Sequence, residues 1–121
     1  MLNGKKIALG VTGGIAVYKA VDLVSRLRKQ GAEVRVIMTE HAQQFVTPLT
    51  FKEISGNKVA VSMWGANQEF NVEHIALANW ADAFVVAPAT ANILAKMANG
   101  IADDLLSTTL LAAQAPIIVC P

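Results

Sequence analysis

Short apolar runs that alternate with helix-length segments are the feature that most constrains the fold of this chain. Strands are expected at residues 5–11, 32–38, 83–87 and 117–120, and the run 59–63 is expected to add another. These runs are apolar at consecutive positions, which is typical of strands covered on both faces. With helices between them, they predict an open, doubly wound parallel sheet of the α/β class.

Helical periodicity fills the segments between the runs. Helices are expected at residues 15–30, 49–54, 72–79, 91–99 and 105–113, and a further short helix is expected to follow Thr39. The first helix has one apolar face, made by Val17, Ala20, Val21, Val24 and Leu27. Helices on both faces of the sheet give a three-layer α/β/α arrangement, which is Rossmann-like or flavodoxin-like.

Composition narrows the class of protein. The 121 residues are 54% hydrophobic and 16% charged, which indicates one domain, residues 1–121, with a packed core. The net charge is +1 without a long basic run, which argues against nucleic-acid binding. The single cysteine, Cys120, excludes an internal disulfide and is expected to be buried and inert. With no secretory signal and no membrane span visible, a cytoplasmic protein is expected.

Ligands of such folds bind beyond the carboxyl ends of the strands, which directs attention to three loops. The first, residues 10–15, reads GVTGGI. Its glycines allow a close backbone approach, the following helix offers unpaired N–H groups to a phosphate, and Thr12 can add a hydroxyl. The glycine spacing matches neither the dinucleotide fingerprint nor the P-loop. A tight turn that binds nothing is the alternative.

The second and third loops each offer hydroxyl groups. Thr39 follows the second strand, and a hydroxyl suits a phosphate better than a carboxylate would. The third loop, residues 87–92, has small residues that leave room for a flat ligand, with Thr90 and Asn92 as polar contacts. For both threonines the alternative is a helix N-cap, and one hydroxyl could serve both purposes.

His74 is the candidate for proton transfer, because histidine exchanges a proton near neutral pH. The stripe formed by Val72, Ile75, Ala76 and Asn79 is expected to pack, leaving His74 on another side of its helix. A structural or solvated histidine is the alternative. No second histidine or cysteine has metal-ligand spacing, so no metal site is expected. Asp103 or Asp104 is expected to cap the helix at 105–113.

Five stretches, in order, resemble the homo-oligomeric flavin-containing cysteine decarboxylases. They are KIALGVTGGIA (6–16), VIMT (36–39), HIALANWAD (74–82), APATAN (87–92) and DDLLS (103–107). The order of five motifs is far more specific than any one of them. The similarity is greatest to the members that decarboxylate 4′-phospho-N-pantothenoylcysteine in coenzyme A biosynthesis.

The resemblance implies a cofactor, a chemistry and a set of site residues. FMN is implied, with its phosphate near Thr12, Gly13, Gly14 and Thr39 and its ring against Ala89, Thr90, Ala91 and Asn92, and His74 is implied as the catalytic residue. The implied reaction oxidises the thiol of a phosphorylated, cysteine-containing small molecule, releases carbon dioxide and returns the electrons. A homo-oligomer, a trimer or a dodecamer, is also implied.

Two departures from the family pattern leave alternatives open. Many members have threonine where this chain has Ile93, and the family continues beyond Pro121 with an Ala-Met-Asn motif and a flap that carries a reactive cysteine. We therefore expect a further C-terminal segment that binds substrate. The alternatives are a decarboxylase of peptidyl-cysteine and a flavin-binding or regulatory subunit without catalysis. The motif around His74 argues against a flavin prenyltransferase.

Overall fold

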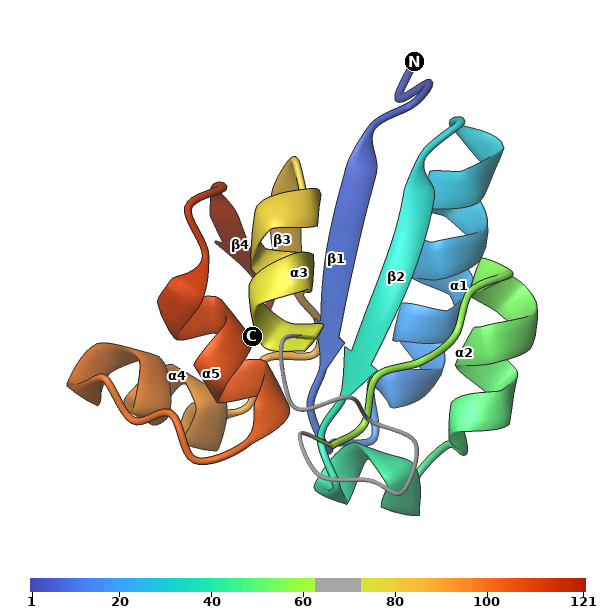
Figure 1. The fold of residues 1–121 in the computed structure, drawn as a ribbon. Coiled ribbons are helices and arrows are strands. Elements are labelled where there is room, and N and C mark those ends of the chain that lie inside the picture. The colour runs from blue at the N-terminus through green and yellow to red at the C-terminus, as the bar shows by residue number, and fades with distance from the viewer. Residues whose placement is uncertain (63–72) are drawn as a thin grey trace.

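The computed structural model describes residues 1–62 and 73–121, with only the backbone of Glu73 and His74. Its centre is a parallel sheet with the strand order β2-β1-β3-β4 (Figure 1). The strands are β1 (Lys6–Val11), β2 (Glu33–Met38), β3 (Ala83–Val86) and β4 (Ile117–Val119). Leu9 of β1 lies in register with Val36 of β2 on one side and Val85 of β3 on the other. The predicted doubly wound α/β fold is confirmed.

Helices cover both faces of the sheet (Figure 1). They are α1 (Val17–Lys29), α2 (Pro48–Ser55), α3 (Glu73–Trp80), α4 (Ala91–Asn99) and α5 (Leu105–Ala112), with a 3₁₀ turn η1 at His41–Gln44. The helices α1 and α2 pack on one face, whereas α3 and α5 pack on the other and α4 lies against α5. Among the described residues, no helix is both long and apolar enough to cross a bilayer.

The sheet separates two apolar clusters. On the α1 side, Val17, Ala20 and Val24 are buried against the sheet, as the periodicity predicts. On the other side, Phe84 and Leu106 are almost fully buried. Close packing there depends on Gly10, because a Cβ at this position would lie 2.5 Å from Cδ1 of Leu106. Because Gly10 has no side chain, α5 can pack closely against β1.

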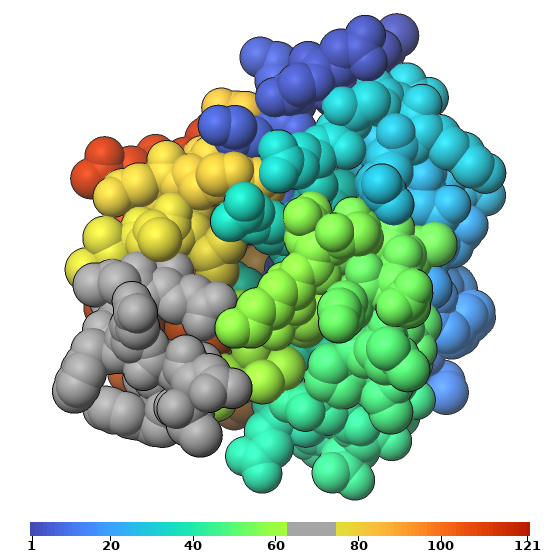
Figure 2. All heavy atoms as spheres, turned by 45° about the vertical axis from the view of Figure 1, so that its right-hand side comes forward, coloured from blue at the N-terminus to red at the C-terminus, as the bar shows by residue number. Residues whose placement is uncertain are grey.

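The strand expected at residues 59–63 is wrong. Only Ala60 pairs with β2: its N–H donates to the carbonyl of Val36 at 3.0 Å, and its carbonyl accepts from the N–H of Met38 at 2.9 Å. The segment follows α2 in the chain and emerges at the surface after Ala60, since Val59 and Ala60 are buried (Figure 2). Val61 already faces solvent with 36% exposure, so the apolar run is too short to extend the sheet. Met63 lies outside the described residues.

Two further expectations about burial are wrong. Cys120 is exposed, because it follows the three-residue edge strand β4, where Ile118 and Val119 are themselves exposed. In α3, Ile75 is 48% exposed, and the helix packs through Leu77 and Ala78 instead. The stripe expected to begin at Val72, which lies outside the described residues, is thus not the packed face. The other two residues of the predicted stripe, Ala76 and Asn79, are exposed as well.

Candidate functional site at the carboxyl ends of β1, β2 and β3

The strand order creates a crevice beside β1. The strands β2 and β3 lie on opposite sides of β1, so the connections that leave β1 and β3 head in different directions. Open α/β sheets bind their ligands at such a topological switch point, outside the carboxyl ends of the strands. The three loops singled out in the sequence follow β1, β2 and β3, and they meet at this end.

Thr12 joins the first loop to the third. Its hydroxyl donates a hydrogen bond to the carbonyl of Pro88 and accepts one from the N–H of Thr90 at 3.1 Å. The residue is only 3% exposed. Because its hydroxyl hydrogen is used within the protein, Thr12 shapes the crevice. The third loop also contains the only cis peptide bond in the described residues, Ala87–Pro88.

Gly13 and Gly14 offer backbone donors in the loop that leads into α1. Within the described residues, no hydrogen bond uses the N–H of either glycine. A Cβ at Gly13 would lie 2.7 Å from the ring of His41, whereas one at Gly14 would meet nothing within 4 Å. Gly13 therefore lets the loop touch η1, and Gly14 faces open space. Unpaired N–H groups at a helix N-terminus are suited to an anion such as a phosphate.

The hydroxyls of Thr39 and Thr90 each accept a hydrogen bond from the turn that follows them. The N–H of Ala42 donates to Oγ1 of Thr39 at 3.1 Å, and the N–H of Ile93 donates to Oγ1 of Thr90 at 3.3 Å. The N-cap interpretation is thus confirmed for Thr90. For η1 the N-cap residue is Glu40, so Thr39 binds this turn from one position earlier and is not its N-cap. A hydroxyl that accepts with its oxygen keeps its hydrogen. The hydrogen of Thr39 has no acceptor among the described residues, so it remains available to a ligand.

A cavity of about 350 Å³ lies between the three loops. Its lining brings together residues from all of them, namely Thr12, Gly13, Thr39, Glu40, His41, Thr90, Asn92, Ile93, Lys96 and Asp104. Ala89 is buried beside it, and Gly14 and Ala91 are not part of the lining. His74 belongs to α3, and its side chain lies outside the described part of the chain.

A second cavity, of about 370 Å³, adjoins the first. The two share four lining residues, which are Thr39, Glu40, Lys96 and Asp104. The second cavity is otherwise walled by the end of β2, by Val61 and Ser62, and by residues 103–106 at the start of α5. We call these two adjoining cavities, at the carboxyl ends of the strands, the crevice.

The shared wall is held by an ion pair and a helix cap. Nζ of Lys96 lies 2.8 Å from Oδ1 of Asp103 and 3.9 Å from Oδ2 of Asp104. The hydrogen bond with Asp103 raises the pKa of Lys96 and lowers the pKa of Asp103. Asp104 also caps α5 by accepting from the N–H of Ser107 at 2.7 Å, and its own N–H donates to Oγ of Ser107 at 3.0 Å. Of the two aspartates, Asp104 is the cap.

Sequence reasoning missed three charged or titratable residues of the crevice. Glu40 and His41 directly follow Thr39, and Lys96 lies one helical turn after Asn92. The i, i+4 spacing of Asn92 and Lys96 was the available signal, since it places them on one face of α4. Among the described residues, no group of three or more histidine, cysteine, aspartate or glutamate side chains could hold a metal ion.

Curated relatives match the chain along its whole length. The coenzyme A biosynthesis bifunctional protein CoaBC of Bacillus subtilis is 53% identical over 121 residues, which is 100% of this chain and 30% of that protein. The proteins of the same name from Haemophilus influenzae and Escherichia coli K12 are each 52% identical over 120 residues, or 99% of this chain and 30% of theirs. The chain thus spans about a third of the length of these relatives.

Solved structures share the fold. The FMN-dependent cysteine decarboxylase SpaF superposes with a TM-score of 0.89 at 36% identity, over 98% of this chain and 69% of that one. A PPC decarboxylase variant in complex with pantothenoylaminoethenethiol superposes with a TM-score of 0.79 at 28% identity, over 97% of this chain and 66% of that one. The flavoprotein family model matches residues 1–121. The chain, with its crevice at the switch point of a parallel sheet, therefore belongs to the flavoprotein family.

Proposed function

We propose that this chain carries out the FMN-dependent decarboxylation of 4′-phospho-N-pantothenoylcysteine to 4′-phosphopantetheine, a step of coenzyme A biosynthesis. The observation that carries the proposal is the crevice in which the three motif-bearing loops meet. Identity of 52–53% to coenzyme A biosynthesis proteins over almost every residue supports this substrate. Similarity to a PPC decarboxylase structure supports the same reaction.

The residues of the crevice fit a flavin mononucleotide. A phosphate needs hydrogen-bond donors, and the unspent N–H groups of Gly13 and Gly14 and the hydroxyl of Thr39 are such donors. A flat ring needs space beside small residues and a polar group to orient it. Asn92 lies on the cavity wall, with Ala89 and Ala91 as small neighbours. We place the phosphate at the first two loops and the ring at the third.

When bound, FMN supplies the two-electron chemistry that this decarboxylation needs and that no amino-acid side chain performs. The chain's own residues hold the site in shape. The hydrogen bonds of Thr12 to Pro88 and Thr90 fix the first loop against the third, so the predicted phosphate and ring sites keep one relative position. His74 is proposed as the catalytic residue, because the family motif around it is intact and histidine can move a proton at neutral pH.

The proposed assembly rests on the same resemblance, and the proposed location rests on the sequence. We propose that the full-length protein forms a homo-oligomer, a trimer or a dodecamer, in the cytoplasm. Large apolar side chains on the described surface, including Ile15 at 78% exposure and Tyr18 at 59%, are compatible with further burial between subunits. Light scattering of the purified full-length protein measures the number of subunits. A monomer at working concentration would reject the proposed assembly.

The direct test is turnover of two thiols by the full-length protein loaded with FMN. One substrate is 4′-phospho-N-pantothenoylcysteine, and the other is a peptide that ends in cysteine. Mass spectrometry should show loss of carbon dioxide from the first substrate only. Loss from the peptide alone would favour the second candidate function, a decarboxylase of peptidyl-cysteine. The 36% identity to the FMN-dependent cysteine decarboxylase SpaF is the observation that favours a related decarboxylase. Flavin binding without either reaction would favour a non-catalytic subunit.

A further inference from the structure

Lys96 stands among carboxylates at the crevice. It lies on α4 and lines both cavities, together with Glu40 and Asp104, and Asp103 lines the second cavity. Among the described residues, no other lysine and no arginine lines either cavity. At neutral pH the crevice therefore has more carboxylates than fixed positive charges.

Ion pairs fix the position of the Lys96 charge. Its Nζ lies 2.8 Å from Asp103 and 3.9 Å from Asp104, and its side chain is only 19% exposed. The hydrogen bond to Asp103 raises the pKa of Lys96, so the ammonium group stays charged at neutral pH. A partly buried charge is screened by salt less than an exposed one. Lys96 thus acts at short range on whatever occupies the cavities.

The proposed ligand adds negative charge to this wall. A phosphate monoester carries about −1.5 to −2 at pH 7. The proposed phosphate position, at Gly13 and Thr39, belongs to the same cavity as Glu40, Lys96 and Asp104. Like charges repel, so the two carboxylates would disfavour a phosphate unless a nearby cation offset them. Riboflavin has no phosphate, so these carboxylates would not repel it in this way.

We propose that Lys96 is a specificity-determining residue, which offsets the carboxylates of the crevice, Glu40, Asp103 and Asp104, and so lets it prefer a phosphorylated flavin to an unphosphorylated one. This inference rests on the proposed FMN site. A purely mechanical role is different. If Lys96 only tethered residues 103–104 to α4, its loss would weaken FMN and riboflavin equally.

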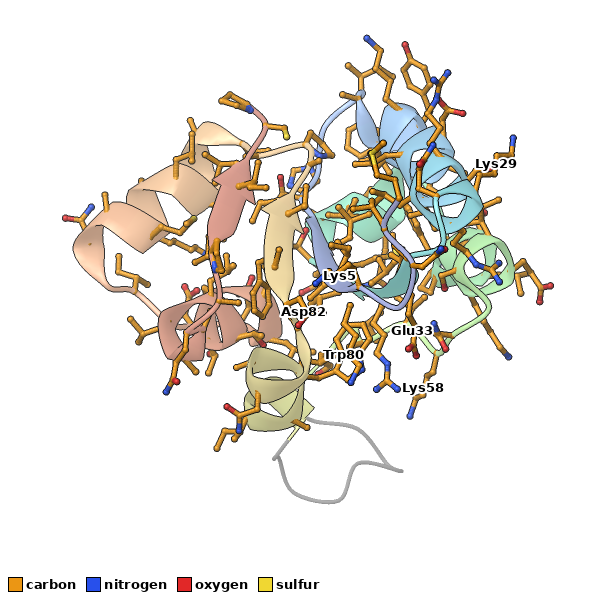
Figure 3. All side chains as sticks on the ribbon, turned by 90° about the horizontal axis from the view of Figure 1, so that it is seen from above. Lys5, Lys29, Glu33, Lys58, Trp80 and Asp82 are labelled. Carbon is orange, nitrogen blue, oxygen red and sulfur yellow. The ribbon has the colours of Figure 1, made fainter. Side chains whose placement is uncertain are left out.

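The first experiment titrates both flavins into the flavin-free, full-length protein and follows quenching of flavin fluorescence. The titration should be done at a pH of about 8, which is above the ordinary pKa of histidine side chains. Lys96→Met should weaken FMN about tenfold or more and riboflavin by less than about twofold. Lys96→Arg should restore FMN binding, because it restores the charge. Lys5→Met is the matched control and should bind both flavins normally, since Lys5 is exposed and directly precedes β1, at the opposite end of the strands from the crevice (Figure 3).

A second experiment removes negative charge from the crevice, whereas Lys96→Met removes positive charge. Asp103→Asn combined with Asp104→Asn removes two negative charges, and asparagine retains the cap of α5. The proposal expects this double variant to bind FMN more tightly, with less effect on riboflavin. A purely mechanical role of Lys96 predicts weaker binding of both FMN and riboflavin, because the double variant loses the same ion pairs. The double variant decides the question alone if Lys96→Met does not fold.

Two results would overturn the role of Lys96: equal weakening of both flavins by Lys96→Met, or weaker FMN binding by the double aspartate variant. Normal FMN binding without decarboxylation would reject the proposed function and leave the role of Lys96 intact. A wild-type protein that binds neither flavin would reject both.

Discussion

Gly13 and Gly14 are adjacent, yet they tolerate side chains differently. A Cβ at Gly14 meets nothing within 4 Å, so Gly14→Asp should fold normally. It should nevertheless lose FMN affinity by about tenfold or more, because it places a carboxylate near the proposed phosphate. Gly14→Asn is the matched control, with nearly the same size and no charge. Equal FMN affinity of the Asp and Asn variants in a fluorescence titration would show that the phosphate lies elsewhere.

His74→Asn should leave FMN binding and assembly intact but abolish most decarboxylation. Asparagine keeps a hydrogen-bonding group yet cannot titrate, and the loss of a general acid or base costs about 10²–10⁴-fold in rate. The measurement is single-turnover flavin reduction by substrate in the full-length protein. A rate near that of the wild type would remove His74 from the mechanism, and loss of flavin or of assembly would indicate a structural role instead.

The sequence predicted which loops form the crevice better than it predicted what each side chain does. Thr12 was expected near the phosphate, and the structure adds a role that was not predicted, because its hydroxyl bonds the third loop. That use depends on contacts between residues 76 or more positions apart, which no local pattern contains. Lys96 and His41 were missed for the same reason, since the sheet brings their elements to one edge. The roles of the eight proposed FMN residues stay predictions.

Among the helices, α5 depends most clearly on its cap. Asp104 and Ser107 form a reciprocal pair of hydrogen bonds at its start. Asp104→Ala should lower stability by about 1 kcal/mol, which thermal unfolding would register as a few degrees. Asp104→Asn should lose less, because asparagine caps nearly as well. An unchanged melting temperature of Asp104→Ala would show that the cap adds little to the stability of this fold.

The contact between α4 and residues 103–104 predicts a pH dependence. The pKa of Asp103 is lowered below 3.8 by its hydrogen bond with Lys96, so its stabilising contribution is present above 3.8 and is lost as pH falls below that value. The pKa of Lys96 is raised above 10.5, so its contribution is lost as pH rises beyond 10.5. The difference in melting temperature between the wild type and Lys96→Met should therefore be constant across neutral pH and shrink at both extremes. A difference that changes steeply near pH 7 would contradict this pairing.

The sequence predicted helices best where the apolar periodicity extends over several helical turns. The helix α4 was predicted with the bounds it has, and the apolar face of α1 was predicted correctly. Prediction failed for a short apolar run at the sheet edge. Of the described residues 59–62, only Ala60 pairs with β2, whereas the strand expected at 117–120 is present as β4. A run of three or four apolar residues does not reveal whether a neighbouring strand or helix will cover it.

For the whole molecule, the doubly wound sheet followed from the alternation of apolar runs and helices. The order β2-β1-β3-β4 then fixes where a ligand can bind, because it sets the switch point between β1 and β3. The crevice at that point, not any single motif, connects the fold to a flavin. The protein should accordingly be yellow when purified with its cofactor, and it should release FMN on denaturation.

The most direct measurement is an experimental structure of the full-length protein with FMN bound. The phosphate should lie within hydrogen-bond distance of the N–H groups of Gly13 or Gly14 and of the hydroxyl of Thr39, with the ring against residues 89–92. A flavin bound away from the carboxyl ends of β1 and β3, or a phosphate held by other residues, would contradict the proposed site.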